Sequence, residues 1–387
     1  MKKISLLVLV IILVFSTSGF SALRKLKDLS RGLPAGVKVY KYQSDDGRAI
    51  LYVAEIDRRY FPGIQFRTSV ARGRVLGRAT VRSMVQSAMK NGKNVLLAVN
   101  ASFGKLDGSY AGVIHNLHIQ NRMVVSPPNR YACFGVTESG EFLMEDIKMN
   151  ISIELAGRQL RVYGLNEERS GSRSVVLYTY KLGSSTRTDS NGYEVVISAP
   201  VPLTPGYKNT FTVREVRDSG NTPIPKDGFV LSARKGSEAA RLFSQLKVGD
   251  QGKLALSFSP DRWNNVVQGI GGNSRLVKHG EPVVDGHRGH NWRKDDPRTA
   301  LGYNDEKLYL MVVDGRQGGY SIGMTYDDMA RAMIEIGATE AINLDGGSSS
   351  TFMAQDQVIN RPSGGKERHV LNAVFITSEE AKVASSD

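Results

Sequence analysis

The chain has 387 residues, of which 41% are hydrophobic and one is a cysteine, and a formal net charge of +13 from 51 basic and 38 acidic side chains. The apolar fraction can supply a sizeable core, which excludes a disordered chain. A single cysteine excludes an intramolecular disulfide and any Cys-rich metal centre, and we interpret Cys133, in an apolar stretch, as a buried thiol.

The N-terminal residues have the order of a secretory signal peptide. Lys2 and Lys3 precede an apolar run from Ile4 to Phe15 that is too short to span a bilayer comfortably, and small polar residues follow up to Ser21. We expect residues 1–21 to be a cleaved signal peptide, with an uncleaved anchor helix as the alternative. Loss of the two lysines leaves 49 basic against 38 acidic residues, a net charge of +11. The pattern predicts an exported protein, periplasmic or extracellular, with no stable membrane insertion after cleavage.

The remaining basic residues are spread along the chain. No basic helix, aromatic-basic repeat or zinc-knuckle spacing is present, which argues against nucleic-acid binding. A diffuse positive field favours anionic glycans or phosphodiester polymers as partners.

Short strands dominate the predicted elements. We expect a basic lead-in over residues 22–45, one domain over 46–378, and a fraying tail over 379–387. Alternating or continuous apolar runs bounded by turn residues predict strands at Val37 to Tyr42, Ala49 to Ile56, Ile64 to Val70 and Val95 to Val99. Helical spacing predicts helices at Thr80 to Asn91 and Gly236 to Leu246, the latter within a strand-rich middle region.

The C-terminal third predicts a strand, a helix and a strand joined by short loops. These are Lys307 to Val313, Thr325 to Ile336 and Glu340 to Leu344, and the helix is expected to start at Thr325 with Asp328 and to stop at Gly337. This order favours a right-handed parallel crossover. The expected fold class is therefore α/β (mixed α+β): a strand-rich domain with a C-terminal parallel strand-helix-strand unit that carries the site.

One aspartate follows each strand of this unit. Asp314 and Asp345 are expected at the same edge of the sheet, where neighbouring strands lie about 4.8 Å apart. Two carboxylates held that close raise one pKa by repulsion, so that one can donate a proton while the other stays ionised. The alternative is that both aspartates only form turns, since each precedes a glycine.

Groups suited to phosphate or sugar oxygens lie near these aspartates in the sequence. Backbone amides and hydroxyls after Asp345 come from Gly346, Gly347, Ser348, Ser349 and Ser350. A guanidinium group matches two phosphate oxygens at once, and the candidates are Arg298, Arg316, Arg361 and Arg368.

Several ordered blocks of this sequence resemble the phosphodiester glycosidase family. They are Val99-Asn100-Ala101-Ser102-Phe103, Pro297-Arg298-Thr299-Ala300, Val313-Asp314-Gly315-Arg316, Ser321-Ile322-Gly323-Met324-Thr325, Asn343-Leu344-Asp345-Gly346-Gly347 and Asn360-Arg361-Pro362 with Arg368. The resemblance covers most of the mature chain. It implies a hydrolase that cleaves the glycosidic bond of a sugar-1-phosphodiester, such as a GlcNAc-1-phosphodiester, on an envelope or extracellular polysaccharide, and releases free sugar and a phosphomonoester.

The resemblance also implies roles for these residues. Asp314 and Asp345 would stand beside the sugar C1, for charge stabilisation, nucleophilic attack or activation of water. The cationic groups would stabilise the departing phosphate. The expected substrate-binding set is Asn100, Arg298, Arg316, Asn343, Gly346, Gly347, Ser348, Ser349, Asn360, Arg361 and Arg368. His115 is a candidate general acid, because an unperturbed histidine pKa of about 6.5 suits proton transfer.

Two other functions remain open. One is a phosphodiesterase that cuts the P–O bond, usually with two metal ions, and the other is a non-catalytic protein that binds anionic envelope glycans. The histidines His279, His287 and His290 could bind a metal, but their spacing matches no standard zinc pattern. We therefore expect no metal site and no cofactor, and leave a structural calcium ion open.

Overall fold

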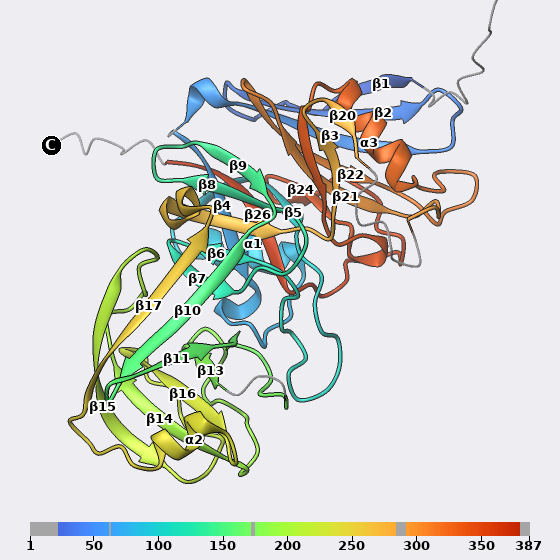
Figure 1. Cartoon of the computed structure of the whole chain (residues 1–387). Helices are drawn as coiled ribbons and strands as arrows, with labels where there is room; N and C mark the ends of the chain where they lie inside the picture. The colour runs from blue at the N-terminus through green and yellow to red at the C-terminus, as the bar shows by residue number, and fades with distance from the viewer. Residues whose placement is uncertain (1–21, 62, 172–174, 284–291, 380–387) are drawn as a thin grey trace, which may run out of the picture.

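The computed structural model is an elongated, strand-rich molecule in which two long strands lead from the upper part into a curled sheet below (Figure 1). The structure describes residues 22–61, 63–171, 175–283 and 292–379, and these form four sheets. Neighbouring strands are antiparallel apart from β12 (Gly164–Leu165) and β13 (Val175–Tyr178). The predicted strand-rich mixed fold is confirmed.

Both aspartates follow strands of sheet 1 whose carboxyl ends lie along the same side of the sheet. Its eight strands lie in the order β1 (Leu23–Asp28), β2 (Val37–Ser44), β3 (Ile50–Asp57), β22 (Lys307–Val313), β21 (Arg298–Tyr303), β23 (Glu340–Asn343), β19 (Ser274–Lys278) and β20 (Glu281–Pro282). Strand β1 pairs with β2, and β2 pairs with β3, so strands of the predicted lead-in segment take part in sheet 1.

The predicted parallel unit is not formed, and the reason is strand β21. This strand lies between β22 and β23 and is antiparallel to each, so the two predicted strands do not pair. Five of its six residues, 298–302, are buried, because it has neighbours on both sides and packing on both faces. Strands β22 and β23 still run in the same direction, since both oppose β21. Asp314 and Asp345 therefore follow strands that end at the same edge of sheet 1.

Two smaller sheets pack against sheet 1. Sheet 3 consists of β7 (Met123–Ser126), β6 (His118–Gln120), β18 (Val266–Gly271), β8 (Cys133–Thr137) and β9 (Phe142–Glu145), and sheet 4 of β25 (Gln357–Val358), β24 (Phe352–Ala354), β5 (Asn94–Asn100), β26 (Asn372–Ser378) and β4 (Ile64–Val70). One core contains Leu310 from sheet 1, Phe134 from sheet 3 and Val374 from sheet 4. Cys133 is fully buried in β8, as predicted.

Sheet 2 forms the curled lower part of the molecule (Figure 1). Its strands lie in the order β11 (Arg158–Val162), β10 (Lys148–Leu155), β17 (Gln251–Ser259), β15 (Lys208–Arg217), β14 (Gly192–Ser198), β16 (Gly228–Arg234), β13 and β12. Strands β11 and β13, from opposite ends of this order, contact each other, so the sheet nearly closes on itself. Its interior belongs to a second apolar core, which includes Leu177, Phe229 and Leu254 and extends to sheet 3 through residues such as Cys133.

The helices are α1 (Val81–Lys90), α2 (Glu238–Phe243) and α3 (Tyr326–Glu335). Helix α3 begins as predicted: Thr325 and Asp328 form a reciprocal capping box, and the chain turns away at Gly337 with φ +104°. Met329 and Met333 of α3 pack on the face of sheet 1 opposite the other sheets. In the described part of the chain, no helix is long and apolar enough to cross a membrane.

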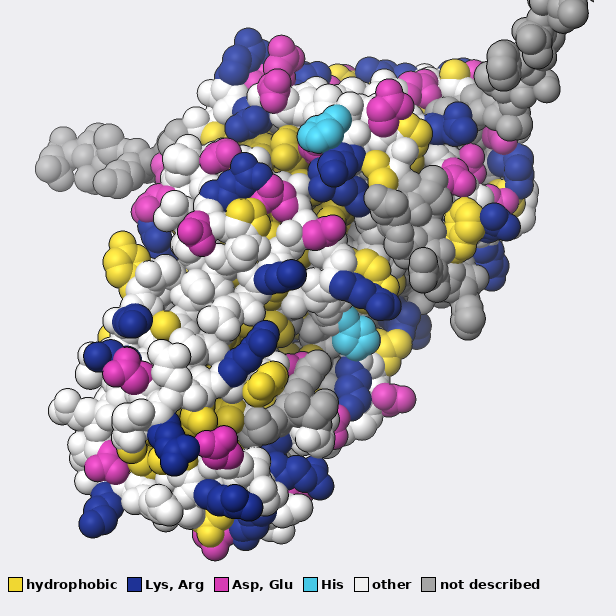
Figure 2. Space-filling view, in the orientation of Figure 1, with side chains coloured by type: hydrophobic (Ala, Val, Ile, Leu, Met, Phe, Trp, Pro, Cys, Tyr) yellow, Lys and Arg dark blue, Asp and Glu magenta, His cyan; other side chains and the backbone are white. Residues whose placement is uncertain are grey.

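Figure 2 shows that lysine and arginine side chains are scattered over the visible face and interspersed with acidic ones. The predicted signal peptide and most of the predicted tail lie outside the described residues, as do His287 and His290.

Candidate functional site

The loop after β23 presents Asp345 between sheets 1 and 4. The backbone N–H of Asp345 donates to the carbonyl of Ala101 over 2.7 Å, and the N–H of Gly347 donates to the carbonyl of Pro297, also over 2.7 Å. Gly347 has φ +62°, and a Cβ atom there would lie 3.1 Å from a guanidinium nitrogen of Arg316. Glycine is required here because both the backbone conformation and the close arginine disfavour a side chain. The loop is thus held by strands that lie far apart in the sequence.

The Asp345 carboxyl is partly buried, and burial raises its pKa to about 6. Opposing contributions come from hydrogen bonds with the Ser349 hydroxyl and the Gly346 N–H and from the positive charge of Arg368. Burial disfavours the ionised form, whereas the donors and the cation favour it. The result is a carboxyl group whose protonation changes just below neutral pH.

Asp314 has a different environment. Its side chain is 1% exposed, and its oxygens accept hydrogen bonds from the Asn360 amide (3.0 Å), the Tyr320 hydroxyl (2.9 Å) and the Arg361 backbone N–H (3.0 Å). Burial raises the pKa of Asp314 and these hydrogen bonds lower it. The carboxylate therefore holds two loops together beneath the surface.

The four predicted arginines divide into two pairs. Arg316 pairs with Asp296 at 2.9 Å and keeps 43% of its side chain exposed, and Arg368 donates to the Ser348 hydroxyl over 3.1 Å. These two guanidinium groups border the loop that carries Asp345.

The other two arginines contribute mainly to the framework. Arg298 is 4% exposed, lies 4.4 Å from the Tyr326 ring centroid and donates to the carbonyls of Met324 and Lys294. Arg361 is exposed and lies 5.0 Å from the ring of Tyr320. Its backbone N–H, rather than its side chain, reaches Asp314.

The predicted asparagines are buried and serve the backbone. The Asn100 amide donates to the Asp345 carbonyl over 2.6 Å, and its oxygen accepts from the Thr351 N–H (3.0 Å) and the Thr299 hydroxyl (2.9 Å). Asn360 bridges Asp314 to the N–H of Phe352.

Asn343 lies in a network that the sequence did not indicate. Its amide nitrogen is 3.0 Å from the Tyr326 hydroxyl and 2.6 Å from the Asn273 side-chain oxygen. Asn273 also donates to Tyr326 over 3.0 Å. The only sequence signal for Tyr326 was its position directly after the predicted helix cap, and Asn273 lay in an unremarkable Gly-Gly-Asn turn.

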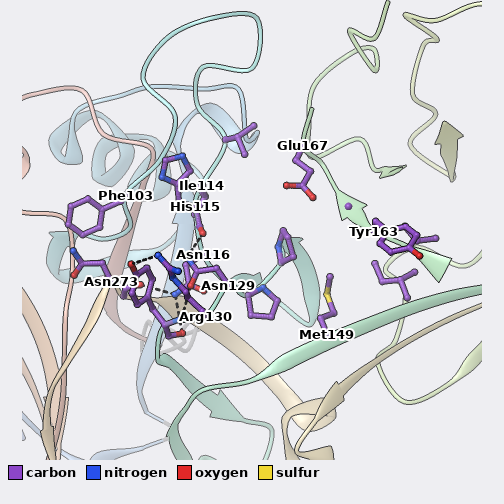
Figure 3. A pocket seen from close by; sticks show the side chains of 18 of the residues that line it. Phe103, Ile114, His115, Asn116, Asn129, Arg130, Met149, Tyr163, Glu167 and Asn273 are labelled. Carbon is purple, nitrogen blue, oxygen red and sulfur yellow. Dashed lines mark hydrogen bonds between the residues drawn. The ribbon is translucent and has the colours of Figure 1, made fainter. Parts of the chain in front are cut away.

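A cavity of 730 Å³ adjoins this network through Asn273. Figure 3 shows Phe103, His115, Asn273 and Arg130 on one side of it and Glu167 and Tyr163 across from them. Burial, and then the charge of Lys105, lower the pKa of His115, so the imidazole is neutral at pH 7. The structure brings His115 to the cavity wall and places no direct contact between it and Asp345 or Asp314 within the described residues.

Sequence reasoning also missed Asp296. It is 2% exposed, precedes the recognised Pro297-Arg298 block, and holds Arg316 in place. Asp296 directly precedes that block in the sequence, but no local pattern indicated its contact with Arg316.

His279, one of the three histidines considered as possible metal ligands, contacts Glu340 at 3.1 Å. Among residues 22–61, 63–171, 175–283 and 292–379, no group of three or more His, Cys, Asp or Glu side chains could hold a metal ion.

Taken together, the contacts describe a strand-rich protein with a partly buried carboxyl group set among guanidinium groups, hydroxyls and backbone amides. Residues 206–377 match the model of the phosphodiester glycosidase family. The family predicted from the motifs is confirmed by this match, which includes Asp314, Asp345 and all four arginines but not Asn100 or His115.

Three known proteins are similar to this chain in sequence or in structure. The SPbeta prophage-derived protein YomE of Bacillus subtilis (strain 168) is 38% identical over 82 residues, which are 21% of this chain and 13% of that protein. A hypothetical protein from Synechocystis has a TM-score of 0.70 and 20% identity over 88% of this chain and 62% of that one. A Burkholderia pseudomallei protein described as exported has a TM-score of 0.65 and 20% identity over 89% and 75%. The chain spans less than two thirds of the first two proteins, and the two structural likenesses establish the fold alone.

Proposed function

We propose that the protein is an exported hydrolase that cleaves the glycosidic C1–O bond of a sugar-1-phosphodiester of the GlcNAc-1-phosphodiester type. The products are free sugar and a phosphomonoester, and the natural substrate is an envelope or extracellular polysaccharide. The observation that carries the proposal is the Asp345 carboxyl, with a pKa raised to about 6, in a loop bordered by Arg316 and Arg368. The family match of residues 206–377 supports the reaction type.

In the proposed reaction, the bond between C1 and the phosphate oxygen breaks and its electron pair stays on that oxygen. Water supplies the hydroxyl group at C1, and its proton leaves to solvent or the phosphate. The ionised Asp345 stabilises the positive charge that develops at C1, or attacks it. Arg316 and Arg368 stabilise the departing phosphate, which needs less protonation than an ordinary sugar leaving group.

The remaining predicted residues receive supporting roles. Ser348 binds sugar hydroxyls or water beside Asp345. The Ser349 hydroxyl and the Gly346 N–H donate to the Asp345 carboxyl, and the Gly347 N–H donates to the Pro297 carbonyl, so these groups position the carboxyl and its loop. We assign Asp314 to positioning, because its oxygens are occupied by Tyr320, Asn360 and Arg361. Asn100, Asn343, Asn360, Arg298 and Arg361 likewise hold the loops that carry the binding groups.

His115 faces the cavity rather than the Asp345 loop. As a neutral imidazole it can donate a hydrogen bond to the phosphate or its acceptor sugar, and its lowered pKa leaves less of the protonated form available as a general acid at pH 7. Export is supported by the predicted signal peptide and by the description of the Burkholderia protein with the similar fold.

The test is incubation of the purified protein with methyl GlcNAc-1-phosphodiester, with separate quantification of free GlcNAc and GlcNAc-1-phosphate. Free GlcNAc is expected, and Asp345→Asn should abolish its release. GlcNAc-1-phosphate as the product would instead establish P–O cleavage. Binding of anionic glycans without turnover of any sugar-1-phosphodiester would establish a binding protein.

A further inference from the structure

The 730 Å³ cavity contains two arginine-tyrosine pairs from different parts of the chain. Arg130 lies 5.4 Å from the ring of Tyr131, in the loop before β8, and Arg161 lies 5.3 Å from the ring of Tyr163, at the end of β11. Both guanidinium groups belong to exposed residues, and Tyr163 is itself 50% exposed. An arginine stacked on an aromatic ring keeps its donors available to a ligand.

Neither arginine forms an ion pair with a carboxylate in the described part of the chain. Many other surface arginines do, such as Arg158 of the same strand β11, which pairs with Glu238 at 2.9 Å. The acidic lining residue is Glu167, which lies across the cavity from Arg130 (Figure 3). With His115 neutral, the lining residues that the structure describes carry two positive charges against one negative charge, so this lining favours an anion.

The cavity is connected to the Asp345 loop by two hydrogen-bonded routes. Asn273 lines the cavity and contacts Asn343, two residues before Asp345. Phe103 also lines it and lies two residues after Ala101, whose carbonyl accepts from the Asp345 N–H. These contacts place the cavity wall next to the segments that hold the Asp345 loop.

The aromatic and proline lining suits sugar rings. Phe103, Tyr131, Tyr163 and Pro128 offer apolar faces of the kind that pack on the C–H faces of a pyranose, while the arginines match phosphate or carboxylate oxygens. A lining of this kind suits an anionic saccharide, in which sugar rings and charged groups alternate along the chain.

We propose that this cavity is the subsite for the acceptor side of the substrate, and that it takes a sugar carrying a further phosphate or carboxylate beyond the scissile phosphodiester. The proposal rests on the proposed function for the direction of the chain. It narrows the substrate class to a repeating, negatively charged saccharide, because a small uncharged leaving group would leave both arginines unused.

The test compares two substrates that share the same scissile bond. One is methyl GlcNAc-1-phosphodiester, which has no acceptor sugar, and the other is a trimer of GlcNAc units joined by 1,6-phosphodiester bonds. Arg161→Gln and Arg130→Gln should each raise the KM for the trimer about tenfold more than the KM for the methyl diester, the size of one charge-assisted hydrogen bond. Arg158→Gln is the matched control, since it removes a paired arginine from the same strand outside the cavity, and should change neither KM.

A binding measurement separates this proposal from the proposed function. Calorimetry with the Asp345→Asn protein should detect binding of the phosphodiester trimer. The affinity for this trimer should fall about tenfold when Arg161→Gln is added. An uncharged GlcNAc trimer should bind the Asp345→Asn protein more weakly than the phosphodiester trimer does. If the wild-type protein hydrolyses neither substrate but this pattern of binding holds, the proposed function is wrong, while the assignment of the cavity as a site for an anionic saccharide stands. Equal affinity for charged and uncharged trimers, or preference for a cationic glucosamine trimer directed by Glu167, would overturn the assignment.

Discussion

The side-chain amide of Asn100, at the end of β5, donates a 2.6 Å hydrogen bond to the backbone carbonyl of Asp345, two residues after the end of β23. This contact joins sheet 4 to sheet 1 at the edge where the candidate site lies. Asn100 is 0% exposed and its oxygen is taken by Thr299 and Thr351. We therefore propose that Asn100 sets the position of Asp345.

Replacement of Asn100 tests this positioning role. Asn100→Ala leaves the Asp345 carbonyl and the Thr351 N–H without their partner, and should lower the free energy of unfolding by about 2–3 kcal/mol. Turnover of methyl GlcNAc-1-phosphodiester should fall through kcat, with little change in KM. Urea unfolding and steady-state kinetics measure the two effects. A variant with unchanged kcat and a raised KM would show that Asn100 binds substrate directly.

Asp345→Asn should have opposite effects on activity and stability. Loss of the carboxylate should reduce kcat by about 10³-fold or more. The folded-state pKa of about 6 lies above the ordinary value of 3.8, so the wild-type carboxyl destabilises the fold once the pH rises through 6. At pH 8 the variant should be more stable than wild type by up to about 3 kcal/mol, and at pH 3.5 the difference should vanish. Thermal unfolding at both pH values checks this, and a variant that is less stable at pH 8 would contradict the burial argument.

The pH dependence of turnover should follow the same group. If the ionised Asp345 acts at C1, kcat/KM for the methyl diester should rise with pH through about 6 and then level off. Initial rates between pH 4.5 and pH 8.5, over a range where the protein stays folded, give the profile. A profile that falls through pH 6 would instead assign Asp345 as the proton donor.

Asp314→Asn should act mainly on stability. The new amide would place N–H groups against the Arg361 N–H and the Tyr320 hydroxyl, and we expect a loss of about 2–4 kcal/mol. Turnover should decline with the folded fraction, and Tyr320→Phe, which removes one donor, should lose roughly 1 kcal/mol. Circular dichroism and activity on the same samples make the comparison. A fully folded Asp314→Asn protein with no turnover would restore Asp314 as a catalytic residue.

His118, buried in sheet 3, should control acid stability. Burial lowers its pKa to about 3, with a smaller contribution from Lys181, whereas the unfolded chain has the ordinary value of 6.5. The unfolded state binds the proton first, so stability is fully present above pH 6.5 and is lost as the pH falls from 6.5 towards 3. This one group contributes a slope of about 1.4 kcal/mol per pH unit. His118→Gln should flatten the dependence in urea titrations between pH 6.5 and pH 4.5, and an unchanged slope would place the effect elsewhere.

Local patterns in the sequence predicted the elements well where neighbours in the chain decide them. Strand β4 was predicted with its observed bounds, and helix α3 was predicted from Thr325, Asp328 and Gly337, because caps and periodicity act within a few residues. The loop residues Gly346 to Ser349 adjoin Asp345 in the sequence, so their closeness to its carboxyl followed from the motif itself.

Only the tertiary structure decided how the two aspartates differ. Their strands end at one edge, as expected, but β21 separates them, and Tyr320, Asn360 and Arg361 enclose Asp314 while Asp345 stays partly open. The same holds for Asn100, Asn273 and the cavity, whose partners lie up to 245 residues away along the chain. Strand order, burial and the occupancy of each oxygen depend on contacts between distant segments, and a local pattern of residues carries no information about them.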